Sequence, residues 1–137
     1  PTALHGWYKY NCGTIDYVGA TSGGASKGDA DRGRILILLG DWSPSVYGGT
    51  STSPVLVDTG NSSTLLSTTT DAVIAKGEIV QQSTISGWTE FTIPLTYVTT
   101  SRRPTHIIVM CTSSYLGDYF TGSSSSVMYV DDFSLLY

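Results

Sequence analysis

The stretch RGRILILL, residues 32–39, is a nearly continuous apolar run that ends at Gly40. Eight residues bounded by glycine are few for a helix. A run without polar alternation is typical of a central strand that is buried on both sides. A short buried helical turn is the alternative. Outward from this run, the sequence alternates between strand-like segments and loops rich in Gly, Ser and Thr.

Four further segments predict strands. Residues 4–10 (LHGWYKY), 105–112 (THIIVMCT) and 127–137 (VMYVDDFSLLY) are rich in aromatic and β-branched residues. Residues 88–98 alternate, which places Trp88, Glu90 and Thr92 on one face and Thr89, Phe91 and Ile93 on the other. Pro94 inside this segment indicates an edge strand or a kink.

The secondary structure of two further segments is less clear from the sequence. Residues 71–82 contain Lys76-Gly77 in the middle, which predicts two short strands about a turn or one strand with a bulge. A helix over residues 71–76, capped by Asp71, is a further alternative. Residues 54–57 predict a short strand between polar loops.

Composition supports an all-β fold. Of the 137 residues, 13% are charged, about half of the roughly 25% typical of soluble domains. Polarity comes instead from 19 Ser and 19 Thr. The plentiful aromatic and β-branched residues argue against disorder, and the 15 Gly argue against a helical bundle. We therefore expect one domain over residues 1–137, folded as a β-sandwich or jelly roll.

Charge and hydropathy exclude two classes of partner. The net charge is −4, and Arg102 and Arg103 are the only adjacent basic residues, so we expect no nucleic-acid binding. The chain lacks an apolar stretch of 18 residues, so we expect no membrane insertion. Richness in Ser, Thr, Tyr and Gly is common in secreted β-proteins, which favours an exported protein at the cell surface or in the periplasm. The start at Pro1 favours a piece of a longer protein.

The two cysteines, Cys12 and Cys111, leave two alternatives open. Each lies near the end of a predicted strand, so one disulfide bond is conceivable. The other interpretation is free thiols, with Cys111 buried because it continues the alternation of Ile107 and Val109.

Several strings together resemble a known family. They are GWYKY (6–10), WTEFTIP (88–94), PTHIIV (104–109), SSYLGDYFTG (113–122) and VMYVDDF (127–133). In this order they resemble the "putative carbohydrate metabolism domain" family of surface and exported proteins of gut bacteria. The resemblance implies a β-jelly-roll similar to carbohydrate-binding modules. It also implies further strands upstream of residue 6, which this chain lacks.

Aromatic side chains in loops are the candidate sugar-binding residues. The apolar C–H faces of sugar rings stack on aromatic rings, and their hydroxyls need polar partners. Trp42 and Tyr47 lie beside Asp41, and Tyr115 and Tyr119 lie beside Asp118. The alternative is that these rings only pack their loops onto the sandwich. For Trp7 and Trp88, which fall on strands, we expect packing in the core.

Structural calcium is the only metal that the sequence suggests. The spacing of Asp29 and Asp31 is similar to the start of a calcium-binding loop. Gly40, however, occupies the position at which such a loop has its bidentate glutamate. Asp131 is similar to the last-strand aspartate that often binds structural calcium in sugar-binding jelly rolls. The alternative is that Asp131 and Asp132 form a solvated edge. His5 and His106 lack partners at zinc spacing.

The sequence therefore predicts a non-catalytic carbohydrate-binding or glycan-handling module of an exported bacterial protein. Its partners would be a glycan and the other domains of the parent protein. One alternative is a structural or adhesive domain without a sugar site. The other is a glycoside hydrolase, which needs two carboxylates across a cleft, but Glu78 and Glu90 are the only glutamates.

Overall fold

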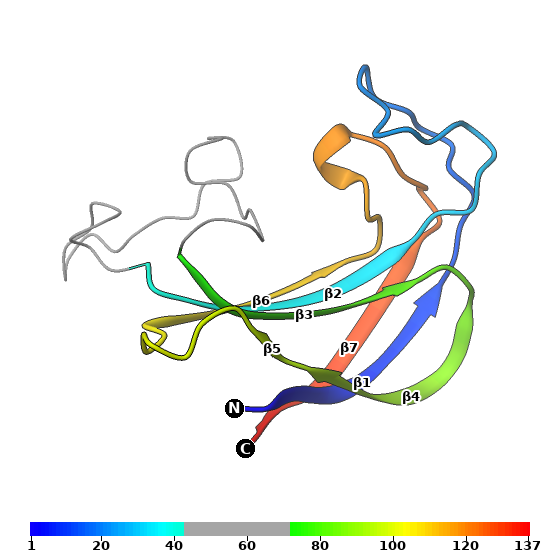
Figure 1. The fold of residues 1–137 in the computed structure, drawn as a ribbon. Helices are drawn as coiled ribbons and strands as arrows, with labels where there is room; N and C mark the ends of the chain where they lie inside the picture. The colour runs from blue at the N-terminus through cyan, green and yellow to red at the C-terminus, as the bar shows by residue number, and fades with distance from the viewer. Residues whose placement is uncertain (43–71) are drawn as a thin grey trace, which may run out of the picture. The chain divides into compact units, whose positions relative to one another are not determined.

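The computed structural model describes residues 1–42 and 72–137, and in this part the chain is an all-β sandwich of two antiparallel sheets. The sequence prediction of the fold class is thus confirmed. The elements are β1 (Ala3–Asn11), β2 (Gly33–Gly40), β3 (Val73–Gln81), β4 (Ile85–Pro94), β5 (Thr96–Tyr97), β6 (His106–Thr112), the short 3-10 helix η1 (Gly117–Tyr119) and β7 (Val127–Leu136) (Figure 1).

The strands form a three-stranded sheet in the order β4-β1-β7 and a four-stranded sheet in the order β5-β3-β2-β6. The apolar run of residues 32–39 becomes β2, between β3 and β6, and every residue of β2 except Arg34 is buried. The prediction of a central buried strand is confirmed. The two chain ends meet in the three-stranded sheet, where the Thr2 N–H donates to the Leu136 carbonyl at 2.6 Å.

The chain divides into two compact units. The first consists of Pro1–Leu36, Gly77–Leu95 and Val109–Tyr137, and the second of Ile37–Lys76 and Thr96–Ile108. The first unit holds the whole three-stranded sheet and both ends of the chain. The residues that form the candidate sites below all belong to this first unit.

Alternation along β1 separates the two faces of the three-stranded sheet. Leu4, Tyr8 and Tyr10 are buried on the inner face, while His5, Trp7 and Lys9 between them are half-buried. On β4 the inner residues are Phe91 and Ile93, as the predicted alternation required, and Trp88, Glu90 and Thr92 are exposed. The outer face of this sheet therefore carries large aromatic and charged side chains rather than small polar ones.

A bulge in β7 closes the inner face around Gly6. Trp7 pairs with Asp131 but His5 pairs with Ser134, so two residues of β7, Asp132 and Phe133, lie opposite Gly6 alone. The ring of Phe133 lies edge-on to that of Phe91, with 5.8 Å between the ring centroids. A Cβ on Gly6 would come within 2.6 Å of Phe133 Cδ1, so only glycine leaves room for this ring pair.

Two predictions about strands need correction or refinement. Residues 73–81 form one continuous strand, so Lys76-Gly77 is neither a turn nor the end of a helix. The strand has room only for glycine at position 77, because a Cβ there would come within 2.5 Å of the Pro94 carbonyl oxygen and 2.7 Å of Ile93 Cγ2. The prediction of an edge strand from Pro94 is confirmed, because β4 is at the edge of its sheet; Pro94 ends β4, and the chain then enters the other sheet as β5. The strand predicted at 54–57 lies outside the described residues.

Both cysteines are free thiols. The expected burial of Cys111 is wrong, because Cys111 is exposed together with Ile107 and Val109 on one side of β6. The predicted alternation is present, but its sense is reversed. In the described part of the chain, no helix is long and apolar enough to cross a membrane.

Candidate functional site

The outer side of the β4-β1-β7 sheet carries a group of exposed rings that we call the aromatic face. It consists of Trp7, Lys9, Trp88, Glu90, Tyr129 and Asp131. Strand register sets its layout, because residues directly opposite one another project from the same face of a sheet. Trp7 pairs with Glu90 on one side and with Asp131 on the other, and Lys9 pairs with Tyr129.

Lys9 lies between the two most exposed rings of the aromatic face. Its Nζ is 4.8 Å from the centroid of the Trp88 ring and 4.9 Å from that of Tyr129. The ammonium group is attracted to the π systems of both rings. Trp88 keeps 47% of its surface exposed and Tyr129 keeps 55%, so both rings remain accessible.

Polar side chains surround the rings. His5 Nε2 contacts Glu90 Oε1 at 2.7 Å, and His5 Nδ1 lies 3.3 Å from Ser134 Oγ. Asp131 accepts a hydrogen bond from the Asp132 backbone N–H at 2.8 Å, which uses one of its carboxylate oxygens. The remaining oxygens of Glu90 and Asp131, with the Lys9 ammonium, are available hydrogen-bonding groups beside flat apolar surfaces.

The structure corrects the expectation that Trp7 and Trp88 pack in the core. Trp88 is exposed, and Trp7 is half-buried on the outer face. The signal was present in the sequence, because alternation already placed Trp88 on the same face as Glu90 and Thr92. That face is polar, so its tryptophan had to be outward.

The predicted loop aromatics Tyr115 and Tyr119 lie in different surroundings. The guanidinium carbons of Arg32 and Arg34 lie 4.7 and 5.1 Å from the Tyr115 ring centroid. Tyr115 is thus half-buried, and its ring contacts the guanidinium groups of two arginines. Tyr119 is 46% exposed and ends η1 next to the exposed Asp118.

Trp42 belongs to the second compact unit and is only 8% exposed. Its ring lies edge-on to His106 at 6.4 Å, and its backbone N–H donates to Thr105 Oγ1 at 3.1 Å. The structure therefore gives Trp42 a packing role rather than an exposed platform. Tyr47 lies outside the described residues.

Asp31, a predicted calcium ligand, is the centre of a hydrogen-bonded cluster. It is 2% exposed, and its Oδ2 accepts bonds from Ser114 Oγ (2.6 Å), Ser126 Oγ (2.8 Å) and the Ser123 N–H (2.9 Å). Its Oδ1 accepts the Arg32 N–H at 2.8 Å. Four protein donors therefore satisfy a carboxylate that burial would otherwise penalise. The cluster ties the loop before β2 to the loop before β7.

Asp29 and Asp131 do not join Asp31 in a metal site. Asp29 is exposed and accepts the Ser26 N–H at 2.8 Å, whereas Asp131 lies on the aromatic face. Among residues 1–42 and 72–137, no group of three His, Cys, Asp or Glu side chains is placed to hold a metal ion. The groups that contact the Asp31 carboxylate are serine hydroxyls and backbone N–H groups rather than further acidic side chains.

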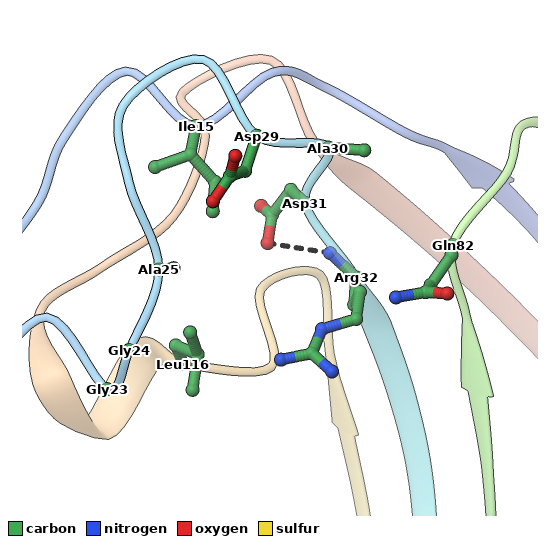
Figure 2. A pocket seen from close by; sticks show the side chains of 10 residues that line it. All are labelled: Ile15, Gly23, Gly24, Ala25, Asp29, Ala30, Asp31, Arg32, Gln82 and Leu116. Atoms are coloured by element: carbon green, nitrogen blue, oxygen red, sulfur yellow. Dashed lines mark hydrogen bonds between the residues drawn. The ribbon is translucent and has the colours of Figure 1, made fainter.

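Two hollows lie beside the Asp31 cluster. The first, which we call the polar pocket, has a volume of about 350 Å³ and is lined by Asp29, Asp31, Arg32, Gln82 and apolar or glycine residues (Figure 2). The second is a more open groove of about 330 Å³ lined by Tyr17, Phe120 and several serines. At its rim Ser124 donates from both its N–H and its hydroxyl to Asp16, which lowers the pKa of that carboxyl group.

The family comparison agrees with the resemblance seen in the sequence. The family model described as "Putative carbohydrate metabolism domain" matches residues 1–136. No curated protein sequence matches the chain.

Among the solved structures that share the fold are two from Bacteroides species. A crystal structure described as a putative glycoside hydrolase from Bacteroides thetaiotaomicron matches with a TM-score of 0.69 and 24% identity, over 100% of this chain and 38% of that one. Another described in the same words, from Bacteroides vulgatus, matches with a TM-score of 0.66 and 20% identity, over 99% of this chain and 52% of that one. The chain thus spans about half or less of the length of these structures.

Proposed function

The chain belongs to the "Putative carbohydrate metabolism domain" family, and from this premise we propose that its aromatic face binds a glycan without cleaving it. The observation that carries the proposal is the exposure of Trp88 and Tyr129 on either side of Lys9. Exposed flat rings with polar neighbours match the two chemical halves of a sugar, its C–H faces and its hydroxyls.

The layout of the face favours an extended glycan over a single sugar. Trp88 and Tyr129 lie on the two outer strands of the sheet, with β1 between them. Adjacent strands are about 4.8 Å apart, so the backbones that carry the two rings are roughly 10 Å apart. This exceeds the width of one sugar ring, so the two aromatic rings would stack on different units of the same chain.

The same layout supports binding rather than catalysis. The face is the open side of a sheet, and Trp88, Glu90, Tyr129 and Asp131 are all exposed on it. Glycoside cleavage depends on two carboxylates that are positioned on either side of the scissile bond, which an open sheet surface does not enclose. We therefore assign the chain the role of an accessory module, which would hold a glycan for other domains of an exported bacterial protein.

A glycan array followed by tryptophan-fluorescence titration of each hit tests the proposal. Trp88→Ala and Tyr129→Ala should each weaken binding about tenfold, which corresponds to about 1.4 kcal/mol. Tyr17→Ala is the matched control, because Tyr17 is also an exposed ring but lies in a loop away from the aromatic face. A folded protein that binds no glycan, or equal losses in all three variants, would contradict the proposal and favour a structural or adhesive domain.

A second candidate function, hydrolysis of a glycosidic bond, has one observation in its favour. Glu90 and Asp131 lie on either side of Trp7 in one row of the face. Their strands are separated by β1, so the backbones are roughly 10 Å apart, close to the carboxylate spacing of about 6.5–9.5 Å in inverting glycosidases. If the protein released reducing ends from a bound glycan, and Glu90→Gln abolished this release, the function of the face would be hydrolysis rather than binding alone. We expect no release.

A further inference from the structure

We propose that the polar pocket is a second saccharide site, which takes one neutral sugar unit through hydrogen bonds to its hydroxyls. The pocket lies where the loop of residues 15–32, the end of β3 and Leu116 come together (Figure 2). The inference goes beyond the proposed function, because the pocket contains none of the residues that make up the aromatic face.

Contacts within the protein hold the Asp31 and Gln82 sides of the pocket in place. Four hydrogen bonds to the buried Asp31 carboxylate hold the backbone at one side. The Cys12 thiol adds two contacts, 3.3 Å to the Asp31 carbonyl and 3.2 Å to the Gln82 carbonyl, and so joins the two segments that face each other. A site that needs no ordering on binding loses less conformational entropy.

Three side chains at the pocket have hydrogen-bonding capacity to spare. The Arg32 guanidinium is stacked on Tyr115, and no carboxylate within residues 1–42 and 72–137 pairs with it. Gln82 is exposed, and Figure 2 shows its amide directed toward Arg32. Asp29 accepts the Ser26 N–H through Oδ2, which leaves Oδ1 available. The pocket thus offers N–H donors, an amide and a carboxylate acceptor together.

The balance of charge indicates a neutral ligand. Arg32 contributes one positive charge, whereas Asp29 and Asp31 contribute two negative charges. An anionic ligand would face two carboxylates for one guanidinium. A sugar hydroxyl both donates and accepts, so neighbouring hydroxyls can accept from Arg32 and donate to Asp29 without carrying charge into the pocket.

The size of the pocket limits the ligand to one sugar unit or a comparably small polyol. Its volume of about 350 Å³ lies at the lower end of the range of small-molecule sites, roughly 300–1,000 Å³. Ile15 and Leu116 supply the apolar part of the wall, against which the C–H groups of the ring would rest. Binding here is by the edge and hydroxyls of a sugar, in contrast to stacking on the aromatic face.

The experiment is an ¹H–¹⁵N NMR titration of the whole chain with the methyl glycosides of glucose, galactose and mannose, and with galacturonate. At least one neutral glycoside should shift the amide signals of Gly24, Asp29 and Gln82 saturably. Gln82→Ala and Asp29→Asn should each weaken that binding about fivefold to tenfold, the loss expected for one hydrogen bond to a ligand. Asp132→Asn is the matched control, since Asp132 is exposed on β7 and lines neither hollow.

Two further comparisons separate this inference from the proposed function. Trp88→Ala alters the aromatic face only, so it should leave the glycoside-induced shifts of the pocket amides unchanged. This result is expected whether or not the aromatic face binds a glycan. Urea unfolding of Gln82→Ala should match the wild type, because its side chain is exposed at the surface. The inference is overturned if no neutral glycoside shifts these signals, if only galacturonate does, or if Asp132→Asn weakens binding as much as Asp29→Asn.

Discussion

The aromatic face and the Asp31 cluster both belong to the first compact unit, yet they arrange their polar and apolar groups in opposite ways. On the aromatic face, large rings are exposed, and register across three strands holds them in place. In the Asp31 cluster, a carboxylate is buried and serine hydroxyls enclose it. Solvent-exposed rings are available to a ligand, whereas a buried carboxylate that accepts four hydrogen bonds within the protein stabilises the fold.

This difference teaches which substitutions should affect folding and which should affect binding. Truncating a ring of the aromatic face removes only its covered half from the packed structure and leaves no buried polar group unpaired, so the folded state should lose less stability than at Asp31. Removing the Asp31 carboxylate leaves several donors without an acceptor in the interior. The polar pocket lies between these extremes, because its walls depend on Asp31 while its ligand-facing groups are partly exposed.

The largest expected effect follows Asp31→Ala. It should lower the free energy of unfolding by about 3–5 kcal/mol, because buried serine donors lose their acceptor. Asp31→Asn keeps one acceptor oxygen and should lose roughly half as much. Urea unfolding followed by circular dichroism measures both. If Asp31→Ala were as stable as the wild type, the distinction between the two regions would fail.

The second effect concerns the inner face below the aromatic rings. Gly6→Ala should lower the free energy of unfolding by about 2 kcal/mol, because its Cβ would come within 2.6 Å of Phe133 and 2.9 Å of Phe91. Gly87→Ala is the control, since a Cβ there meets nothing within 4 Å. The two urea midpoints should differ clearly, and equal midpoints would show that the Phe133 ring moves aside freely.

These two regions also show what sequence patterns can predict. The apolar run of β2 correctly predicted a strand buried on both sides, and the alternation of β4 correctly predicted which of its residues face inward, because burial follows directly from periodicity. The same periodicity placed Trp88 outward with Glu90, but a general preference of tryptophan for the core outweighed it in our prediction. For a half-exposed sheet, the polarity of the neighbours at positions i±2 is the better guide.

The role of Asp31 could not be predicted in the same way. Its three serine partners, Ser114, Ser123 and Ser126, are more than 80 residues away in the sequence, among 19 serines. Nothing local distinguishes an aspartate that binds an ion from one that binds hydroxyls. Loop residues such as Tyr115 are equally ambiguous, because their exposure depends on which distant side chain, here Arg32 and Arg34, covers the ring.

A smaller effect should appear in alkaline solution. Burial raises the pKa of Tyr10 to about 12, and the nearby Asp31 charge acts in the same direction. The unfolded chain therefore deprotonates this phenol first, from about pH 10, and the stability that the neutral phenol contributes is lost as the pH rises from 10 to 12. The loss at pH 11 should be roughly 1 kcal/mol.

The comparison of wild type with Tyr10→Phe isolates that contribution. The variant lacks the hydroxyl that donates to the Ser113 carbonyl at 2.9 Å, so it should be less stable at neutral pH. Its urea midpoint should nevertheless fall less steeply than that of the wild type between pH 9 and pH 11.5. Parallel curves would mean that Tyr10 does not contribute to the alkaline loss.

The smallest effect should follow Lys9→Met on the aromatic face. The substitution keeps the length of the side chain but removes its contacts as a cation with Trp88 and Tyr129, at 4.8 and 4.9 Å. Such contacts contribute about 0.5–1 kcal/mol each at exposed sites, and the apolar methionine stem should replace part of this. We therefore expect a loss of less than about 1 kcal/mol in urea unfolding. A loss as large as that of Asp31→Ala would show that the exposed rings are held by Lys9 as firmly as the loops are held by Asp31, and the face would then be part of the folding core rather than a surface kept open for a ligand.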